Sequence, residues 1–176
     1  MKQSNYQKNI KYMVLSAVFA AMVFVLTAFV HIPTHQGYVH VGDGIIYLSA
    51  AILPGPYAAA SAAIGAGLSD YMSGYAIWVI PTAIIKGLTA FCFSSKKETI
   101  ICKRNFIAII PAALICVGGY FIAGALLAVI SGTPIQAALI ASLADIPSNG
   151  LQAAASTVLF IILGASLDRV KIKNHL

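Results

Sequence analysis

An apolar run covers residues 106–130 and contains no charged side chain. A helix of about 20 such residues crosses a hydrocarbon core about 30 Å thick, whereas a small soluble domain has no interior large enough to bury so many apolar residues. Apolar residues make up 60% of the 176-residue sequence and charged residues only 9%, and the mean hydropathy is +0.89. The chain is therefore predicted to be an all-α integral membrane protein, with one membrane domain over 1–176.

The apolar runs together predict a bundle of six transmembrane helices. Their approximate ranges are 12–30, 43–54, 56–72, 76–94, 106–130 and 147–168. The turn "LPGP", residues 53–56, separates the second span from the third, because prolines and glycine interrupt a helix. The second span is short, which is possible for a helix inside a bundle.

Lysine and arginine predict which side of the membrane each connection faces. Ten of the eleven lie outside the spans: Lys2, Lys8, Lys11, Lys96, Lys97, Lys103, Arg104, Arg169, Lys171 and Lys173. Positively charged connections remain in the cytoplasm, so both termini, the 53–56 turn and the 95–105 connection are predicted to be cytoplasmic. The connections 31–42, 73–75 and 131–146 then face the exterior.

Nucleic-acid binding and a cleaved signal peptide are both disfavoured. A net charge of +6 is compatible with nucleic-acid binding, but the basic residues lie between apolar runs and form no folded basic face. A cleaved signal peptide over residues 1–30 competes with a first span. The sequence "AFVHIPTH" offers no clear A-x-A cleavage site, and an even number of spans explains the charges without cleavage.

Cysteine predicts neither a disulfide framework nor a metal site. Cys92, Cys102 and Cys116 are widely spaced, form no CxxC pair and have no nearby histidine partner. No cofactor or metal ion is expected from this pattern.

Two stripes of polar residues lie within the predicted spans. Trp78, Thr82, Lys86 and Thr89 share one face of the fourth span, and Asp145, Ser148, Asn149 and Gln152 share one face at the start of the last. Polar side chains at this depth face a partner or a cavity, because lipid cannot satisfy them. Interhelical hydrogen bonding accounts for the threonines and Ser148. A ligand pocket is the favoured interpretation of Trp78, Lys86 and Asn149.

Lys86 has a second interpretation. A lone ammonium inside the membrane is unfavourable, so the side chain either contacts a ligand or pairs with a carboxylate. Asp70 and Asp43 are the candidate partners for such a pair. Both alternatives remain open at the level of sequence.

The segment "ADIPSNG" predicts a break and a restart of helix before the last span. Asp145 lies near the expected N-cap, and Pro147 lies in the first turn, where its missing N–H is harmless. Asn149 and Gln152 then lie in the first two turns. The positive end of this helix would favour an electron-rich ligand group.

The first exterior connection, "HIPTHQGYVHVGD", is the most polar interruption of the chain. Metal binding by His31, His35 and His40 is disfavoured, because their spacing requires a helix that the proline and glycine oppose. Acid–base chemistry by His40 and Asp43 lacks an accompanying nucleophile or carboxylate cluster. A loop that folds over an outward-facing pocket is the remaining interpretation, with Tyr38 and His40 presenting ring edges to it.

Small residues mark one face of the first span. Ala17 and Ala21 lie four residues apart in "SAVFAAM", and the third span, "AAASAAIGAGLSD", carries small residues on nearly every side. Such faces allow helices to approach closely. Internal packing explains the third span, whereas the face of the first could equally meet another protein.

The order of several motifs resembles one transporter family. "GYVHVGD", "LPGP", "GLSDYMSGY", "IPTAIIKGL" and, near the end, "IPSNGLQAA" are similar to the substrate-binding S components of energy-coupling factor (ECF) vitamin transporters. The nearest group includes the hydroxymethylpyrimidine-type proteins, close to the riboflavin-type ones. The resemblance covers most of the chain and fades over 96–140.

The resemblance implies a six-helix S component in the bacterial plasma membrane, with both termini cytoplasmic. Such a subunit captures a vitamin outside the cell and associates with a membrane T component and two cytoplasmic ATPases. The matching alanines of the first helix, Ala17 and Ala21, would dock onto the T component. No Walker motif is present, so the partners would hydrolyse ATP.

The expected ligand is a small heteroaromatic vitamin or precursor. Its predicted contacts are Tyr38, His40, Tyr75, Trp78, Lys86, Asn149 and Gln152. The aromatic residues indicate a flat ring, and the amides indicate exocyclic amino or hydroxyl groups. Hydroxymethylpyrimidine and pyridoxine both satisfy this description, and a larger flavin is a further possibility.

A stand-alone transporter and an intramembrane enzyme fit the sequence less well. A stand-alone ion-coupled transporter would use Asp43, Asp70 and Asp145, but such proteins usually contain internal repeats, and no convincing repeat relates the first three spans to the last three. An intramembrane enzyme would need a catalytic constellation, which the sequence lacks.

Overall fold

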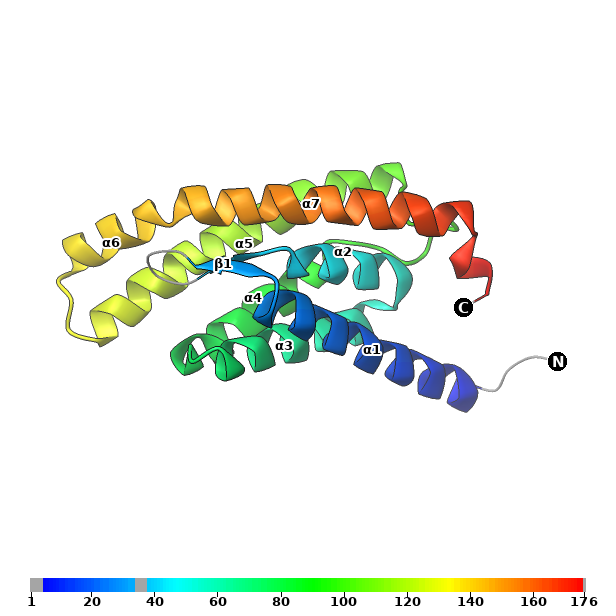
Figure 1. Ribbon diagram of the computed structural model, residues 1–176, viewed down its shortest axis with the longest axis horizontal. Helices are drawn as coiled ribbons and strands as arrows, with labels where there is room; N and C mark the ends of the chain where they lie inside the picture. The colour runs from blue at the N-terminus through cyan, green and yellow to red at the C-terminus, as the bar shows by residue number, and fades with distance from the viewer. Residues whose placement is uncertain (1–4, 34–37, 176) are drawn as a thin grey trace.

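Figure 1 shows the computed structural model, which describes residues 5–33 and 38–175. His35, a ligand in the disfavoured metal hypothesis, lies outside this range. The elements are α1 Asn5–Ala28, β1 His31–Pro33, β2 Tyr38–His40, α2 Gly42–Ile52, α3 Gly55–Met72, the short 3-10 helix η1 Ala76–Trp78, α4 Val79–Ala90, α5 Lys103–Ile130, α6 Ile135–Ala144, α7 Ile146–Arg169 and the 3-10 helix η2 Ile172–Asn174. The fold is that of an all-α membrane protein.

Three stretches of the described chain are long and apolar enough to cross a membrane. They are α1, α5 and the interval Ile135–Arg169, which contains α6 and α7. Many large apolar side chains on these helices point outward, as lipid-facing surfaces require. Shorter apolar helices, α2 and the stretch Ala76–Ala90, complete the set of candidates.

Helix α2 is the central element of the bundle. Its residues Gly42–Ala51 are all buried, and it packs against α1, α3, α4 and α7. At about 1.5 Å per residue, its 11 residues cover only about half of a hydrocarbon core. The predicted second span, 43–54, is therefore a short helix enclosed by protein, and it places Asp43 deep inside the molecule.

Close helix packing depends on the small residues of α1 and α3. A Cβ atom at Gly65 would lie 2.5 Å from the carbonyl oxygen of Ala20, so only glycine permits this approach. The same helix face carries the buried alanines Ala58, Ala62 and Ala66. This is the internal packing that the sequence predicts for the third span.

The segment "ADIPSNG" contains the break and restart of helix that the sequence predicts. The helix before the break is α6, Ile135–Ala144, which begins after Pro134 in the N-cap position and occupies most of the exterior connection 131–146. Asp145 alone separates α6 from α7, and Pro147 lies in the first turn of α7 as expected.

The two ends of the described chain lie at the same end of the bundle (Figure 1). There the Asp168 carboxylate accepts hydrogen bonds from the backbone N–H groups of Ile100 and Ile101, at 2.7 and 2.8 Å. Lys173 Nζ donates to the carbonyl oxygens of Ala51 and Ser95, at 2.9 and 2.8 Å. These bonds attach the 94–101 connection to the end of α7 and place the predicted cytoplasmic segments together.

Candidate functional site

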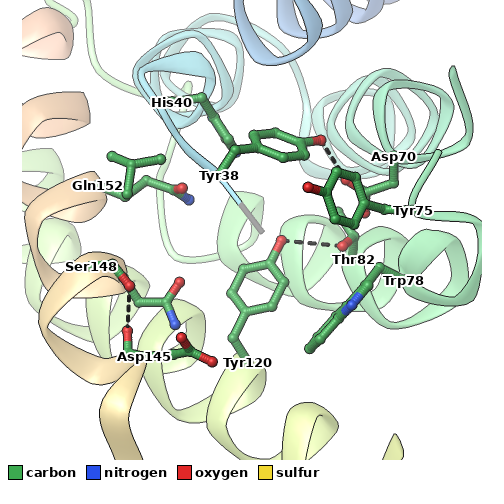
Figure 2. A pocket seen from close by; sticks show the side chains of 12 residues that line it. Tyr38, His40, Asp70, Tyr75, Trp78, Thr82, Tyr120, Asp145, Ser148 and Gln152 are labelled. Carbon is green, nitrogen blue, oxygen red and sulfur yellow. Dashed lines mark hydrogen bonds between the residues drawn. The ribbon is translucent and has the colours of Figure 1, made fainter. Parts of the chain in front are cut away.

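A pocket of about 80 Å³ lies beside strand β2, whose residues form part of its lining. Residues from β2, α3, the η1 region, α4, α5 and the start of α7 surround it (Figure 2). The lining comprises Tyr38, Val39, His40, Asp70, Tyr75, Trp78, Thr82, Tyr120, Asp145, Ser148, Asn149 and Gln152. Of the seven residues predicted to bind substrate, every one but Lys86 belongs to this set.

Tyr38 connects the paired strands β1 and β2, which together we call the flap, to helix α3 at the pocket. Strands β1 and β2 pair antiparallel, with His31 opposite His40. The Tyr38 hydroxyl donates a hydrogen bond to Asp70 Oδ1 at 2.6 Å (Figure 2). Burial, reinforced by the Asp70 carboxylate, raises the pKa of Tyr38 well above its usual value, so the hydroxyl keeps its proton. This hydrogen bond attaches strand β2 to helix α3.

His40 is the buried end of the flap. Its Nδ1 accepts a hydrogen bond from the backbone N–H of Gly42 at 3.1 Å, at the first turn of α2. Burial lowers the pKa of His40 to about 3, against the opposing influence of Asp43. The imidazole is therefore neutral at physiological pH, and its single proton is on Nε2.

Aromatic rings form one side of the pocket. The Tyr38 and Tyr75 ring centroids are 5.3 Å apart, and those of Trp78 and Tyr120 are 5.8 Å apart. The Tyr120 hydroxyl donates to Thr82 Oγ1 at 3.2 Å, which is the interhelical hydrogen bond predicted for that threonine. Rings arranged in this way present both faces and edges to a flat ligand.

The start of α7 supplies the polar side. Ser148 Oγ donates to the carbonyl oxygen of Asp145 at 2.8 Å, and Asn149 and Gln152 follow on the same helix face. Asp145 is in the N-cap position, although its side chain makes no capping hydrogen bond. The amides lie at the positive end of the helix dipole, where partial negative charge is favoured.

Lys86 lies beneath the pocket and pairs with Asp43. Its Nζ lies 2.8 Å from Asp43 Oδ1, and neither side chain is exposed. The ammonium also donates to Cys116 Sγ at 3.3 Å and lies 4.9 Å from the centre of the Tyr120 ring. Of the two alternatives left open by the sequence, the structure contains the carboxylate pair with Asp43.

Several lining residues were not predicted as ligand contacts. Tyr120 lies in the span over which the family resemblance fades, and a single tyrosine there gives no pattern to follow. Thr82 shares a helix face with Trp78, and this periodicity is the signal that could have identified it. Asp70 was considered as a partner of Lys86 or an ion-binding carboxylate, and Asp145 as an N-cap residue or an ion-binding carboxylate.

Ala17 and Ala21 are exposed on α1 and do not belong to the pocket lining. They line an open apolar groove between α1 and α3, together with Met13, Ser16, Ala20, Phe24, Tyr57, Ala60, Ile64, Gly65 and Leu68. The face is smooth because its central residues are small. A helix of another membrane protein could approach it closely.

These features define a membrane protein with a small polar and aromatic pocket between its helices, beside the flap. A family model described as "ECF-type riboflavin transporter, S component" matches residues 7–169. The chain belongs to this family. It is thus a multi-pass plasma-membrane protein and the substrate-binding subunit of an ECF transporter for a vitamin, and it is not an enzyme. No curated protein matches the sequence.

Proposed function

We propose that this subunit captures a small, uncharged or cationic heteroaromatic vitamin precursor of the hydroxymethylpyrimidine or pyridoxine type. The single observation that carries the proposal is the pocket beside the flap. Tyr75, Trp78 and Tyr120 offer ring surfaces, and Asn149 and Gln152 offer amide groups. This combination matches a flat ring with exocyclic amino or hydroxyl substituents.

The size of the pocket supports a single ring. Its volume of about 80 Å³ is well below the 300–1,000 Å³ typical of sites for drug-sized ligands. Riboflavin, which the family description names, is the second candidate ligand. Its three fused rings and polyol chain would require the flap and the η1 region to move apart.

The charge of the lining supports a ligand without negative charge. Asp70 and Asp145 line the pocket, and no lysine or arginine does so among the described residues. A phosphate or carboxylate group would meet these acidic side chains without a cation to balance it. Phosphorylated forms of the same vitamins are therefore expected to be rejected.

The test is identification of the small molecule that co-purifies with the protein, by mass spectrometry, followed by calorimetry. Hydroxymethylpyrimidine and pyridoxine are expected to bind, and pyridoxal phosphate is expected not to bind. If riboflavin alone binds, the second candidate ligand is correct. The η1 region must then move as well as the flap to make room for it.

For delivery, we propose that Ala17 and Ala21 contact the T component of a complex that also contains two ATPases. The exposed groove of small residues between α1 and α3 supports this assignment. The stand-alone ion-coupled alternative is weakened, because Asp43, one of its three carboxylates, is already paired with Lys86. Uptake by vesicles containing this chain alone would favour that alternative.

A further inference from the structure

Asp43 receives hydrogen bonds from three different helices at one carboxylate oxygen. Lys86 Nζ of α4 donates to Oδ2 at 2.8 Å, Gln152 Nε2 of α7 donates to the same atom at 3.0 Å, and Cys116 Sγ of α5 is a weaker donor at 3.6 Å. Asp43 and Lys86 are completely buried. A carboxylate beside a buried ammonium remains ionised and can only accept hydrogen bonds.

This pairing determines which end of the Gln152 amide faces the pocket. A glutamine amide is a donor at nitrogen and an acceptor at oxygen, and its orientation follows from its partners. If the amide were reversed, Gln152 Oε1 would lie against the Asp43 carboxylate, and two acceptors would repel each other. Within 5–33 and 38–175, no residue donates a hydrogen bond to Oε1, while the Gln152 side chain lines the pocket.

We propose that Asp43, held in place by Lys86, is a positioning residue that fixes Gln152 as a hydrogen-bond acceptor and thereby selects ligands with a donor at that point. The proposal rests on the proposed function and adds the chemical class of the recognised group. That group is an exocyclic amino group, a hydroxyl group or a ring N–H.

The selectivity for a hydrogen-bond donor follows because the Gln152 side-chain amide cannot rotate by 180°. In a solvent-exposed glutamine, a ligand acceptor is accommodated by rotation of the amide. Here rotation would leave the Asp43 carboxylate without its hydrogen bond and facing an oxygen, at a depth where bulk solvent cannot replace the donor. A ligand that lacks the donor therefore leaves Gln152 Oε1 unpaired.

The double variant Asp43→Asn/Lys86→Met tests this role. It removes both charges together, so no unpaired charge remains buried. The amide introduced at position 43 can donate or accept, so the Gln152 amide is no longer held in one orientation. Cys116→Ala is the matched control, because it removes a neighbour of both charged groups, 3.3 Å from Lys86 Nζ and 3.6 Å from Asp43 Oδ2, but leaves the ion pair and the hydrogen bond from Gln152 in place.

Calorimetry with hydroxymethylpyrimidine and two methylated analogues gives the first readout. The dimethylamino analogue lacks the amino protons, and the methoxymethyl analogue lacks the hydroxyl proton. One of them is expected to bind the natural protein and Cys116→Ala about tenfold more weakly than the parent. In the double variant, the ratio of the two dissociation constants, analogue to parent, is expected to fall below about threefold. The methyl groups add the same bulk in every protein, so a change in this ratio reports the hydrogen bond. An equal ratio in all three proteins would overturn the proposal.

A second readout does not depend on the ligand. In protein labelled with ¹⁵N-glutamine, the side-chain amide signal of Gln152 is identified by its absence from Gln152→Ala. Slow proton exchange is expected in the natural protein and in Cys116→Ala, and faster exchange in the double variant. An unchanged rate of amide proton exchange in the double variant would overturn the proposal that Asp43 orients Gln152. If hydroxymethylpyrimidine fails to bind while the exchange rates change as expected, the proposed ligand is wrong and the orientation of Gln152 stands.

Discussion

Lys86 Nζ lies 2.8 Å from both carboxylate oxygens of Asp43, and this ion pair joins α4 to the first turn of α2 in the centre of the bundle. Neither residue has any exposed surface. A buried pair of this kind contributes little net stability compared with apolar residues, but the loss of one partner leaves an uncompensated charge. The stability of the protein is therefore expected to be sensitive to single substitutions of Asp43 or Lys86.

Lys86→Met is expected to destabilise the protein by about 3–5 kcal/mol, because the Asp43 carboxylate is left buried without its counterion. The double variant Asp43→Asn/Lys86→Met is expected to recover most of this loss. Thermal unfolding in detergent measures both. Equal destabilisation by the single and double variants would contradict the assignment of Asp43 as the partner that matters.

Tyr38→Phe is expected to loosen the flap. The substitution removes the hydrogen bond to Asp70, which is worth about 1.5–3 kcal/mol for a charged acceptor. Hydrogen exchange of a peptide spanning β2 should therefore accelerate by about tenfold or more. Tyr71→Phe is the control, since Tyr71 lies one residue beyond Asp70 on α3 but is 64% exposed. The same exchange rate in both variants would mean that Tyr38 does not hold the flap.

Stability is expected to fall in mild acid through His40. The pKa of His40 is about 3 in the folded protein, because of burial, and about 6.5 when the residue is exposed. Between these values only the unfolded state binds the proton, so stability decreases as the pH falls below about 6.5. The loss attributable to this residue is about 2 kcal/mol at pH 5.

Unfolding midpoints measured between pH 7.5 and 5 test the contribution of His40. His40→Gln removes the titrating group while keeping a side chain that can accept a hydrogen bond from Gly42. Its midpoint should change less with pH than that of the natural protein. Parallel pH profiles for the two proteins would show that His40 is not the group responsible.

Ala17→Trp is expected to prevent assembly without affecting ligand capture. The indole would fill the exposed groove between α1 and α3, where small residues permit close helix approach. Co-purification with the T component measures assembly, and calorimetry on the isolated subunit measures capture. Persistence of the complex would exclude this face of α1 as the docking surface.

Half of the pocket lining could be predicted from the sequence, because polar residues are rare at membrane depth. Trp78 and Asn149 were predicted from helical periodicity within apolar runs, and Tyr38 and His40 from the polar connection between two spans. In each case a polar or aromatic side chain interrupts a stretch that is otherwise apolar, as contact with lipid requires. The resemblance to S components supplied the family, and the match over residues 7–169 confirms it.

The three-dimensional pairing of polar residues could not be predicted in the same way. Lys86 has two candidate carboxylate partners in the sequence, and only the depth of α2 brings Asp43 to it. Tyr120 reaches the pocket from a helix that carries no periodic polar signal. These outcomes depend on tertiary packing, which a pattern along one helix does not contain.

Calorimetric titration of hydroxymethylpyrimidine into the natural protein, Trp78→Ala and Asn149→Ala tests the central claim most directly. We predict tight binding to the natural protein and a loss of about 1–3 kcal/mol in each variant, through lost stacking or hydrogen bonding. Unchanged affinity in both variants would contradict the assignment of this pocket as the ligand site.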